Sequence, residues 1–306
     1  MRRGFIKCVI ARPDPKPRVL GYEAENNGSW MRRTFFDANI YNHISDAEIK
    51  LVKQGAALGH IELLSTPQIL AELAATFKKD RDRAIDLRSK YAQLITQNVL
   101  QPPPVLLQTE IASLLNRRRL VLYLDGDNKT EFFTYVEKLR NGDLDPYTEQ
   151  FIGRITRLKK EQFKLSKLGF SRMEALVLKE PLNKFPTFDQ FLREGIARGE
   201  RRKEIERYVV KDLGKNAGKA ANFIEKRLHK LPHLAITLRV VPALTYYYHV
   251  EKNRPKHGDI FYCGYFVCLA TVSTFISDDE GARELFKLVC PTKECLSLSD
   301  FIVSMN

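Results

Sequence analysis

The sequence predicts an α/β protein with a central parallel sheet flanked by helices and a mainly α-helical insertion. Short apolar runs alternate with helix-like segments near both ends of the chain, and strands joined through helices by short connections are typical of a parallel sheet. A long basic stretch with helical periodicity separates the two ends. With 306 residues, 44% of them hydrophobic, the chain is large enough for a well-buried core.

The first part of the sheet domain is expected in residues 31–105. Its elements are a strand within the segment 33–40 (RTFFDANI), a helix over 45–58, a second strand over 60–66 and a helix over 67–79. The first strand ends near Asp37, a carboxylate that directly follows an apolar run. Ser45 is placed to cap the first helix, and Pro67 suits the first turn of the second.

The rest of the chain divides into three parts. Residues 1–30, rich in proline, asparagine and charge, are interpreted as an N-terminal extension outside the core. QPPP at 101–104 breaks the chain, so a basic helical insertion is expected over 106–240. The second part of the sheet domain then occupies 241–306. Its elements are a buried helix over 257–270 that opens with Asp259, a strand over 272–277, a helix over 281–289 and a last strand over 294–302.

Composition argues against several classes of protein. No run approaches the roughly 18 apolar residues that span a membrane, and the N-terminal residues lack the pattern of a signal peptide, so no membrane partner is expected. The five cysteines are odd in number and no pair has CxxC spacing, which argues against a zinc site and a disulfide framework. This cysteine usage fits a reducing cytoplasm.

The formal charge of +13 is concentrated in one region. Residues 151–230 contain 21 Lys and Arg against 10 Asp and Glu, a net charge of +11. Such a basic block is expected in a protein that binds a polyanion, and nucleic acid is favoured over a membrane surface. The alternative is a set of solvated helices with surplus lysine. The expected nucleic-acid contacts are Lys159, Lys160, Arg201, Arg202, Lys203, Lys215 and Lys219.

Acidic residues follow two of the expected strands. Asp37 comes after the first strand, and Asp278 and Asp279 come after the strand that follows the insertion. In open parallel sheets, ligands bind outside the carboxyl ends of the strands, so these carboxylates should meet at one edge, with Glu72 on the helix after the second strand. Each acid also has a simpler interpretation: Asp37 as a turn residue, Glu72 as solvated helix surface, and Asp259, Asp278 and Asp279 as helix caps.

Four segments resemble, in order, the motifs of the PIN-domain nucleases: TFFDANIYNHIS, TPQILAELAATF, HGDIFYCGYFVCLATVSTFISDDEGARELF and ECLSLSDFI. That family shows a strand ending in Asp with Asn nearby, a helix carrying Glu, a later helix opening with Asp, and a strand ending in Ser/Thr-x-Asp. The resemblance implies a PIN-like sheet and four catalytic, metal-binding acids, namely Asp37, Glu72, Asp259 and Asp279. It places Asp278 between Ser277 and Asp279 as a further metal ligand, and makes Asn39 and Ser277 supporting residues.

The function implied by this resemblance is a metal-dependent endoribonuclease that cleaves phosphodiester bonds with water activated by Mg²⁺ or Mn²⁺. Several carboxylates in one cleft repel one another, and hard divalent cations relieve that cost. The implied partner is nucleic acid, and RNA is preferred to DNA only because RNA is the more frequent substrate in this family. An inhibitory, antitoxin-like protein is a further implied partner. The basic insertion would hold the nucleic-acid backbone without reading its sequence.

Two other functions stay open. A PIN-like module with a degenerate metal cluster would bind nucleic acid without cleaving it. The run LVLYLDGD places Asp125 and Asp127 in a DxD after an apolar stretch, which resembles the first motif of haloacid-dehalogenase-type phosphatases, with Asp125 as the nucleophile. The competing interpretation of that run is an acidic turn between a strand and a helix. The three tyrosines at 246–248 are expected to pack in the core rather than to stack on bases.

Overall fold

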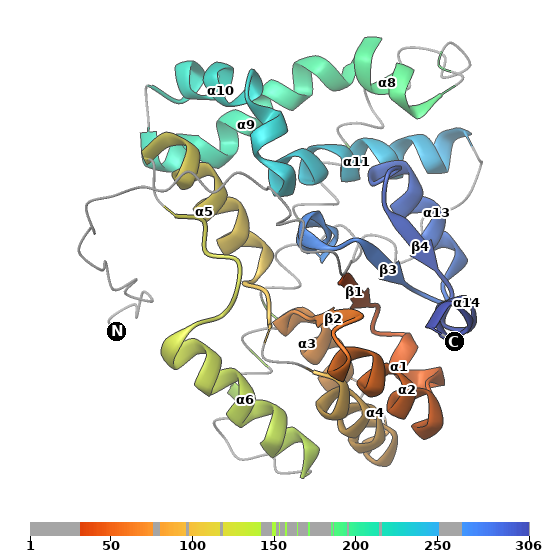
Figure 1. Ribbon diagram of the computed structural model, residues 1–306. Helices are drawn as coiled ribbons and strands as arrows, with labels where there is room; N and C mark the ends of the chain where they lie inside the picture. Colours follow the sequence, from red (N-terminus) through yellow and green to blue (C-terminus); the bar gives the residue numbers. More distant parts are fainter. Residues whose placement is uncertain are drawn as a thin grey trace.

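The structure is a computed structural model that describes residues 31–75, 80–95, 98–116, 119–141, 187–194, 196–213, 216–250 and 265–305, with a few single positions between 149 and 185. Asp259, Lys159, Lys160, Lys215 and the expected extension 1–30 lie outside the described residues. Within them the protein is a mixed α/β protein with a parallel sheet surrounded by helices (Figure 1). Among the helices of the described ranges, none is both long and apolar enough to cross a membrane.

The central sheet has four strands in the described residues, and all neighbouring strands pair in parallel. In sheet order they are β2 (Ile61–Leu64), β1 (Arg32–Phe36), β3 (Thr274–Ile276) and β4 (Glu294–Leu296). Phe35 of β1 pairs in register with Leu64 on one side and with Phe275 on the other. Segments from both ends of the chain thus form one parallel sheet, which confirms the predicted fold class.

Helices cover both faces of this sheet. They include α1 (Ile40–His43), α2 (Asp46–Ala57), α13 (Glu280–Val289) and α14 (Leu298–Met305). On one face, the ring of Phe36 packs against aromatic residues of α1 and α14. On the other face, Phe35 packs against Phe275, which stacks on a phenylalanine of α13. Successive side chains of β1 therefore point to opposite, buried faces, and this explains why the strand is an uninterrupted apolar run.

Two of the predicted helices begin at the predicted residues. At the start of α2, Ser45 Oγ accepts a hydrogen bond from the Glu48 N–H (3.3 Å), and the Glu48 carboxylate accepts one from the Ser45 N–H (2.7 Å). This capping box satisfies two amide donors that the helix itself cannot. Pro67 is the first residue of α3 (Pro67–Ala75). Its apolar residues Ile69, Leu70 and Leu73 are buried, as their helical spacing predicted.

The prediction of a last strand over 294–302 is wrong beyond Leu296. β4 ends at that residue, and α14 follows. Ser297 Oγ accepts a hydrogen bond from the Asp300 N–H (3.1 Å), a local bond that starts a helical turn. Leu298 and Phe301 are then buried at helical spacing. The helix expected over 257–270 is described only in its last part, where η5 (Phe266–Thr271) is a 3-10 helix.

The sheet is extended beyond β2 by isolated bridges. Ser65 bridges in parallel to Val99, and Leu100 bridges in antiparallel fashion to Tyr123. The apolar run before Asp125 therefore forms a bridge at the margin and is no strand of the four-stranded sheet. Three helices belong to this region, namely α4 (Arg81–Leu94), α5 (Pro103–Asn116) and α6 (Gly126–Arg140).

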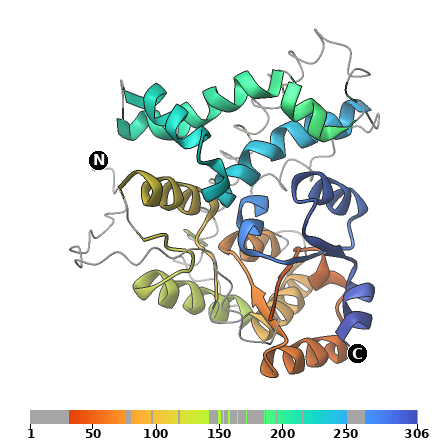
Figure 2. The same ribbon diagram turned by 45° about the horizontal axis from the view of Figure 1, so that its top comes forward.

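The basic insertion is helical in its described parts. Its elements are α8 (Phe188–Glu194), α9 (Ile196–Leu213), α10 (Ala217–Glu225), the short η4 (Leu228–Lys230) and α11 (Pro232–Val250). α11 packs against η5 and α13, and Figures 1 and 2 show α8, α9 and α10 in a layer on the side of α11 away from the strands. The expected insertion limits fall inside α5 and α11, and residues of both helices join the main hydrophobic core. The three tyrosines at 246–248 are buried in that core, which confirms the core interpretation.

A buried acid–histidine pair joins α5 to α11. Glu110 and His233 are 1% and 0% exposed. Glu110 Oε1 lies 2.9 Å from His233 Nδ1 and accepts the His233 N–H, while Oε2 accepts the Leu234 N–H at 2.8 Å. The carboxylate thus satisfies amide donors at the start of α11 and complements the positive end of the helix. These bonds fix the start of α11, the helix that packs against η5.

Candidate functional site

The strand order reverses between β1 and β3, and we use the term crevice for the region outside the carboxyl ends of these two strands. The connection through α2 leads from β1 to one edge strand, β2, and the connection through α13 leads from β3 to the other, β4. Such a reversal is the point at which open parallel sheets bind ligands, outside the carboxyl ends of the strands. Asp37 follows β1 and Ser277 follows β3, and the Asp37 N–H donates to the Ile276 carbonyl at 2.9 Å. Two of the segments singled out in the sequence therefore meet at this point.

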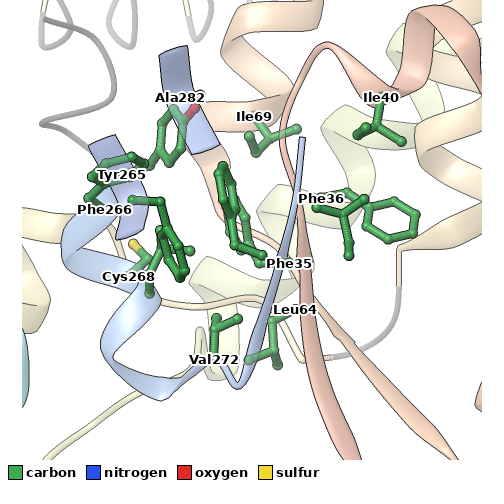
Figure 3. Packing of buried hydrophobic residues seen from close by; sticks show 14 of the residues in the cluster. Phe35, Phe36, Ile40, Leu64, Ile69, Tyr265, Phe266, Cys268, Val272 and Ala282 are labelled. Atoms are coloured by element: carbon green, nitrogen blue, oxygen red, sulfur yellow. The ribbon is translucent and has the colours of Figure 1, made fainter. Parts of the chain in front are cut away.

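Asp37 is a buried carboxylate held by three donors. It is only 2% exposed. Oδ1 accepts hydrogen bonds from the Ala38 N–H (2.7 Å) and the Tyr265 hydroxyl (2.9 Å), and Oδ2 accepts one from the Ser277 hydroxyl (2.8 Å). Tyr265 lies at the entrance to η5, and its ring stacks on Phe35, two residues before the acid (Figure 3). The carboxylate plane is consequently fixed by contacts from β1, η5 and the end of β3.

The hydrogen bonds around Ser277 determine the direction of its hydroxyl proton. Ser277 Oγ accepts from Asn39 Nδ2 and from the Asp279 N–H, both at 3.2 Å. A hydroxyl has one proton and two acceptor lone pairs, so with both lone pairs engaged the proton is donated to Asp37. Asn39 stands at the N-cap of α1 but makes no capping bond with its side chain. It ties the end of β1 to the end of β3 instead.

The pKa of Asp37 is raised from 3.8 to about 7. Burial is the main cause, because it disfavours the charged form, and the negative charge of Glu72 adds to it. The hydrogen bonds from Ser277, Tyr265 and Ala38 oppose this rise, since they stabilise the carboxylate. Glu72, half-buried on α3, is thus close enough to Asp37 to act on its proton affinity. A buried acid with a strongly raised pKa beside a second acid is a typical feature of a functional site.

The two acids after β3 hold the neighbouring backbone. Asp279 is the N-cap of α13, and its Oδ1 accepts the Ala282 N–H at 3.0 Å. Asp278 Oδ1 accepts the Leu298 N–H at 2.9 Å, at the start of α14. The capping interpretation is therefore confirmed for Asp279. Both acids thus bind a backbone amide through Oδ1, directly after Ser277.

Among the residues that the structure describes, no group of three or more histidine, cysteine or acidic side chains is close enough to hold a metal ion. Asp37 and Glu72 are the pair that interacts, while Asp278 and Asp279 lie one and two residues beyond Ser277. Asp259, the fourth acid implied by the resemblance, lies outside the described residues. The described site is thus a pair of coupled acids with further acids at its margin.

Three residues of the site were missed in the sequence. Tyr265 is one aromatic residue in a run of several, and nothing in the run distinguishes it. Arg283, one turn into α13, donates from Nη1 to the Ser277 carbonyl at 2.9 Å, which brings a guanidinium to the end of β3. Lys293 donates from Nζ to the carbonyls of Leu269, Ala270 and Val272, each at 2.6 Å. Tyr265 and Lys293 act across 228 and at least 21 residues, and Arg283 binds a backbone carbonyl six residues before it, a kind of partner that no side-chain pattern indicates.

Lys293 fixes the segment that supplies both side-chain donors to Asp37. Its three carbonyl partners lie at the end of η5 and just before β3. Tyr265 precedes this segment and Ser277 follows it. A lysine ammonium has three donors, and here each donates to a carbonyl at or just after the C-terminal end of η5. Burial lowers the pKa of Lys293 from 10.5 to about 8.

The DxD pair lies away from this crevice. Asp125 and Asp127 are exposed at the start of α6, where Gly126 takes a positive φ of 46°. A left-handed backbone at that position suits glycine and a turn. The structure therefore places these acids as the turn interpretation expects, at the margin of the sheet rather than at a central strand.

The described basic residues of the expected interface lie on α9 and α10. Arg202, Lys203 and Lys219 are exposed, and Arg201 is half-buried with a bond to the Leu192 carbonyl. Arg202 also lies 3.6 Å from Glu206. These side chains therefore lie in the outer layer, which α11 separates from the strands in both views (Figures 1 and 2).

Ser277→Ala is expected to raise the pKa of Asp37 above about 7, because it removes a hydrogen bond that lowers this pKa. A raised folded-state pKa means that stability is present at low pH and is lost as pH rises through that pKa. The midpoint of this loss, measured by thermal unfolding in EDTA across pH 4–9, should move to higher pH, and Tyr265→Phe should act in the same direction. Ser273→Ala is the matched control, since its hydroxyl donates to the Arg33 carbonyl at the exposed start of β3. An unchanged midpoint in both site variants would contradict the expected role of the two hydroxyls.

A scan of the chain against protein-family models, a search of curated proteins and a search of solved structures found no match.

Proposed function

We propose that the protein is a metal-dependent nuclease of the PIN type, an endoribonuclease. Its main support is the buried Asp37 at the β1–β3 crevice, whose pKa burial and Glu72 raise to about 7. A protein that buries one carboxylate beside another loses stability for as long as both are charged. A cation bound between them would remove that penalty, which gives a physical reason for the arrangement.

The residues present fit a small, hard cation. Mg²⁺ is commonly held by only one or two carboxylates, with waters and substrate phosphates completing its coordination, so the pair Asp37 and Glu72 suffices as the protein's share. Among the described residues, three donors bind Asp37, and one of these donates to Oδ2. The second lone pair of Oδ2 is the one that we propose binds the cation. Asp279, Asp278 and Asp259 are the further proposed ligands, and a bound Mg²⁺ or Mn²⁺ would supply Lewis-acid chemistry at the phosphodiester.

The chain's own residues would orient this site and attract its substrate. Ser277 and Tyr265 keep Asp37 in one rotamer, and Asn39 keeps the ends of β1 and β3 together. Arg283 brings a fixed positive charge to the same strand end, suited to a phosphate oxygen. The basic insertion would contact the nucleic-acid backbone, which positions a strand without selecting its sequence.

The proposed activity is tested with purified protein and single-stranded RNA in the presence of Mn²⁺ or Mg²⁺. Internal cleavage that EDTA abolishes and added Mn²⁺ restores is the expected result. Cleavage that persists in EDTA would contradict the proposed metal requirement. Single-stranded DNA of the same base sequence tests the preference for RNA.

A non-catalytic nucleic-acid-binding module is the second candidate function. One observation favours it, namely that the described residues contain no three-membered group able to hold a metal ion. Such a module would bind RNA in a salt-sensitive manner, in EDTA as well as in Mn²⁺, and would leave it intact. A DxD phosphatase would instead hydrolyse a phosphate monoester and lose that activity in Asp125→Asn, while keeping it in Asp37→Asn.

A further inference from the structure

An aromatic side chain stands exposed on the basic face of α10. Phe223 is 39% exposed, although large apolar side chains of the described residues are mostly buried. The Arg227 guanidinium lies over its ring, 3.8 Å from the centroid, and Arg227 Nη1 also donates to the Phe223 carbonyl at 3.4 Å. Lys219 and Lys226 are exposed on the same stretch of chain. We call Phe223, Arg227, Lys219 and Lys226 the α10 platform.

Phe223 is exposed although the opposite face of α10 is packed in a hydrophobic cluster. The inner face of α10 carries Ala217, Ala221 and Ile224, which are buried in the second hydrophobic cluster with residues of α9 and α11. Phe223 falls on the outer side of the helix, with Lys219 one turn before it and Arg227 one turn after it. The ring is thus held at the surface by a helix whose other face is firmly packed.

The charge around the ring restricts what it can bind. Residues 217–230 contain four lysines and arginines against one glutamate. An apolar protein partner would gain little from such a surface, whereas single-stranded nucleic acid offers both a polyanionic backbone and flat bases. Proteins that bind single strands without sequence preference combine these two features, a basic surface and an aromatic ring on which a base stacks.

We propose that the α10 platform is a stacking site for a base of single-stranded nucleic acid. Arg227 covers one face of the Phe223 ring and orients it, and a base stacks on the part of the ring that stays exposed. Lys219 and Lys226 contact the phosphates on either side. This inference rests on the proposed function, which supplies the nucleic-acid substrate. It adds the place where a strand binds, namely α10, and the form that binds, namely the single strand.

The platform lies apart from the crevice that contains Asp37. α10 belongs to the outer layer, and α11 lies between that layer and the strands in both views (Figures 1 and 2). A strand anchored on α10 must therefore extend some distance to reach the acids. The platform should accordingly bind short and long strands, and it should promote cleavage only of strands long enough to reach the acids.

The test measures binding to a fluorescent oligouridylate of about 20 nucleotides in EDTA, so that cleavage is not needed. Phe223→Ala is expected to raise Kd by about 5- to 150-fold, the effect of one stacked base, while the slope of log Kd against log salt stays the same. Lys226→Gln should instead reduce that slope by roughly 0.7, the loss of one phosphate contact on a single strand.

Conservative variants separate stacking from apolar bulk. Phe223→Trp should keep the affinity, and Phe223→Leu should lose it to the same extent as Phe223→Ala. Leu58→Ala is the matched control, since Leu58 is 62% exposed on the distant end of α2. If Phe223→Leu binds as the wild type does, or if duplex RNA or anionic vesicles compete as well as the single strand, the stacking proposal is overturned.

The outcomes also separate this inference from the proposed function. Binding that depends on Phe223 in a protein without metal-dependent cleavage would overturn the nuclease and keep the platform. Cleavage that EDTA abolishes, together with unchanged binding in Phe223→Ala, would do the reverse. RNA and DNA oligomers of the same length and base sequence show whether the platform distinguishes ribose from deoxyribose. Equal Kd values for the two are expected because stacking uses only the base.

Discussion

Asp37→Asn is expected to lower metal-dependent RNA cleavage by on the order of a hundred- to a thousandfold. The substitution removes the charge that would hold the cation at the crevice, and a metal's stabilisation of a phosphodiester transition state amounts to several kcal/mol, with about 1.4 kcal/mol for each tenfold in rate. Asn fits the volume of Asp, so the loss should come from chemistry and not from unfolding. Cleavage is measured on single-stranded RNA with saturating Mn²⁺.

The same variant should be more stable than the wild type at pH 8 when both are free of metal. Asp37 has a pKa of about 7 in the folded protein and an ordinary value of 3.8 for an exposed carboxyl. Between those values the folded state binds more protons than the unfolded state, so the stability of the wild type falls as pH rises from about 4 to about 7 and stays low above that. Asn carries no charge and avoids this loss.

Two opposing effects determine how much more stable Asp37→Asn is than the wild type. The raised pKa corresponds to a few kcal/mol, at about 1.4 kcal/mol per pKa unit. Against it stands the hydrogen bond from Ser277, since Asn would present an amide N–H where the Ser277 hydroxyl now donates, a loss of about 1 kcal/mol. The charge effect is larger, so we expect a net gain of about 1–3 kcal/mol at pH 8 and much less at pH 4.

Chemical unfolding in EDTA at pH 4, 6 and 8 measures this pH dependence. Asp46→Asn is the matched control, because Asp46 is exposed in the first turn of α2 and should change neither activity nor the pH profile. A variant that is inactive and also less stable at pH 8 would indicate a structural role for Asp37. A variant that keeps wild-type cleavage would eliminate Asp37 as a metal ligand.

Lys293→Met is expected to reduce the free energy of unfolding by about 2–4 kcal/mol at pH 7. Below its pKa of about 8 the amine is protonated, and its three donors satisfy the carbonyls of Leu269, Ala270 and Val272. Methionine has a similar length and no donor, so it leaves these carbonyls without the ammonium. The half-buried ammonium itself costs free energy, and its removal offsets part of the loss.

The consequence should reach the crevice. Without Lys293, the segment from Tyr265 to Ser277 loses its anchor at the middle, and the two hydroxyls that orient Asp37 become less well fixed. Lys293→Arg should lose less stability than Lys293→Met, because it keeps the charge but its planar fork cannot reproduce three convergent bonds. Lys287→Met, at an exposed position of α13, is the control. Equal unfolding free energies for Lys293→Met and Lys287→Met would show that the three bonds contribute no net stability.

The fold class could be predicted because local patterns are consistent with the tertiary fold. The apolar run before Asp37 forms β1 and is buried on both faces, as such a run must be in a parallel sheet. Ser45 caps α2 because its side chain needs only the amide three residues ahead. The last strand was predicted too long because a few apolar residues fit both the two-residue period of a strand and the 3.6-residue period of a helix. The hydrogen bond to Ser297 Oγ begins a helical turn there.

The candidate site could be predicted only in part. Asp37 was expected at this edge because it follows a strand, and parallel strands bring their carboxyl ends to one edge, whereas Asn39 and Ser277 were implied only by the resemblance to the PIN-domain motifs. Tyr265, Arg283 and Lys293 were not found, since Asp37 is close to Tyr265 only in the folded chain and the backbone carbonyls that Arg283 and Lys293 bind have no sequence pattern. Phe223 was also missed, because a phenylalanine at helical spacing is more often core than surface.

The sequence by itself determined the alternation of strands and helices, the caps that begin them and the position of acids at strand ends, because these depend on contacts a few residues apart. Only the tertiary structure decided that β1 and β3 are neighbours with the crevice between them, and that Asp37 is buried beside Glu72. The reason is physical: desolvation and charge coupling depend on every element packed around a group, and a protein brings those elements together from the whole chain.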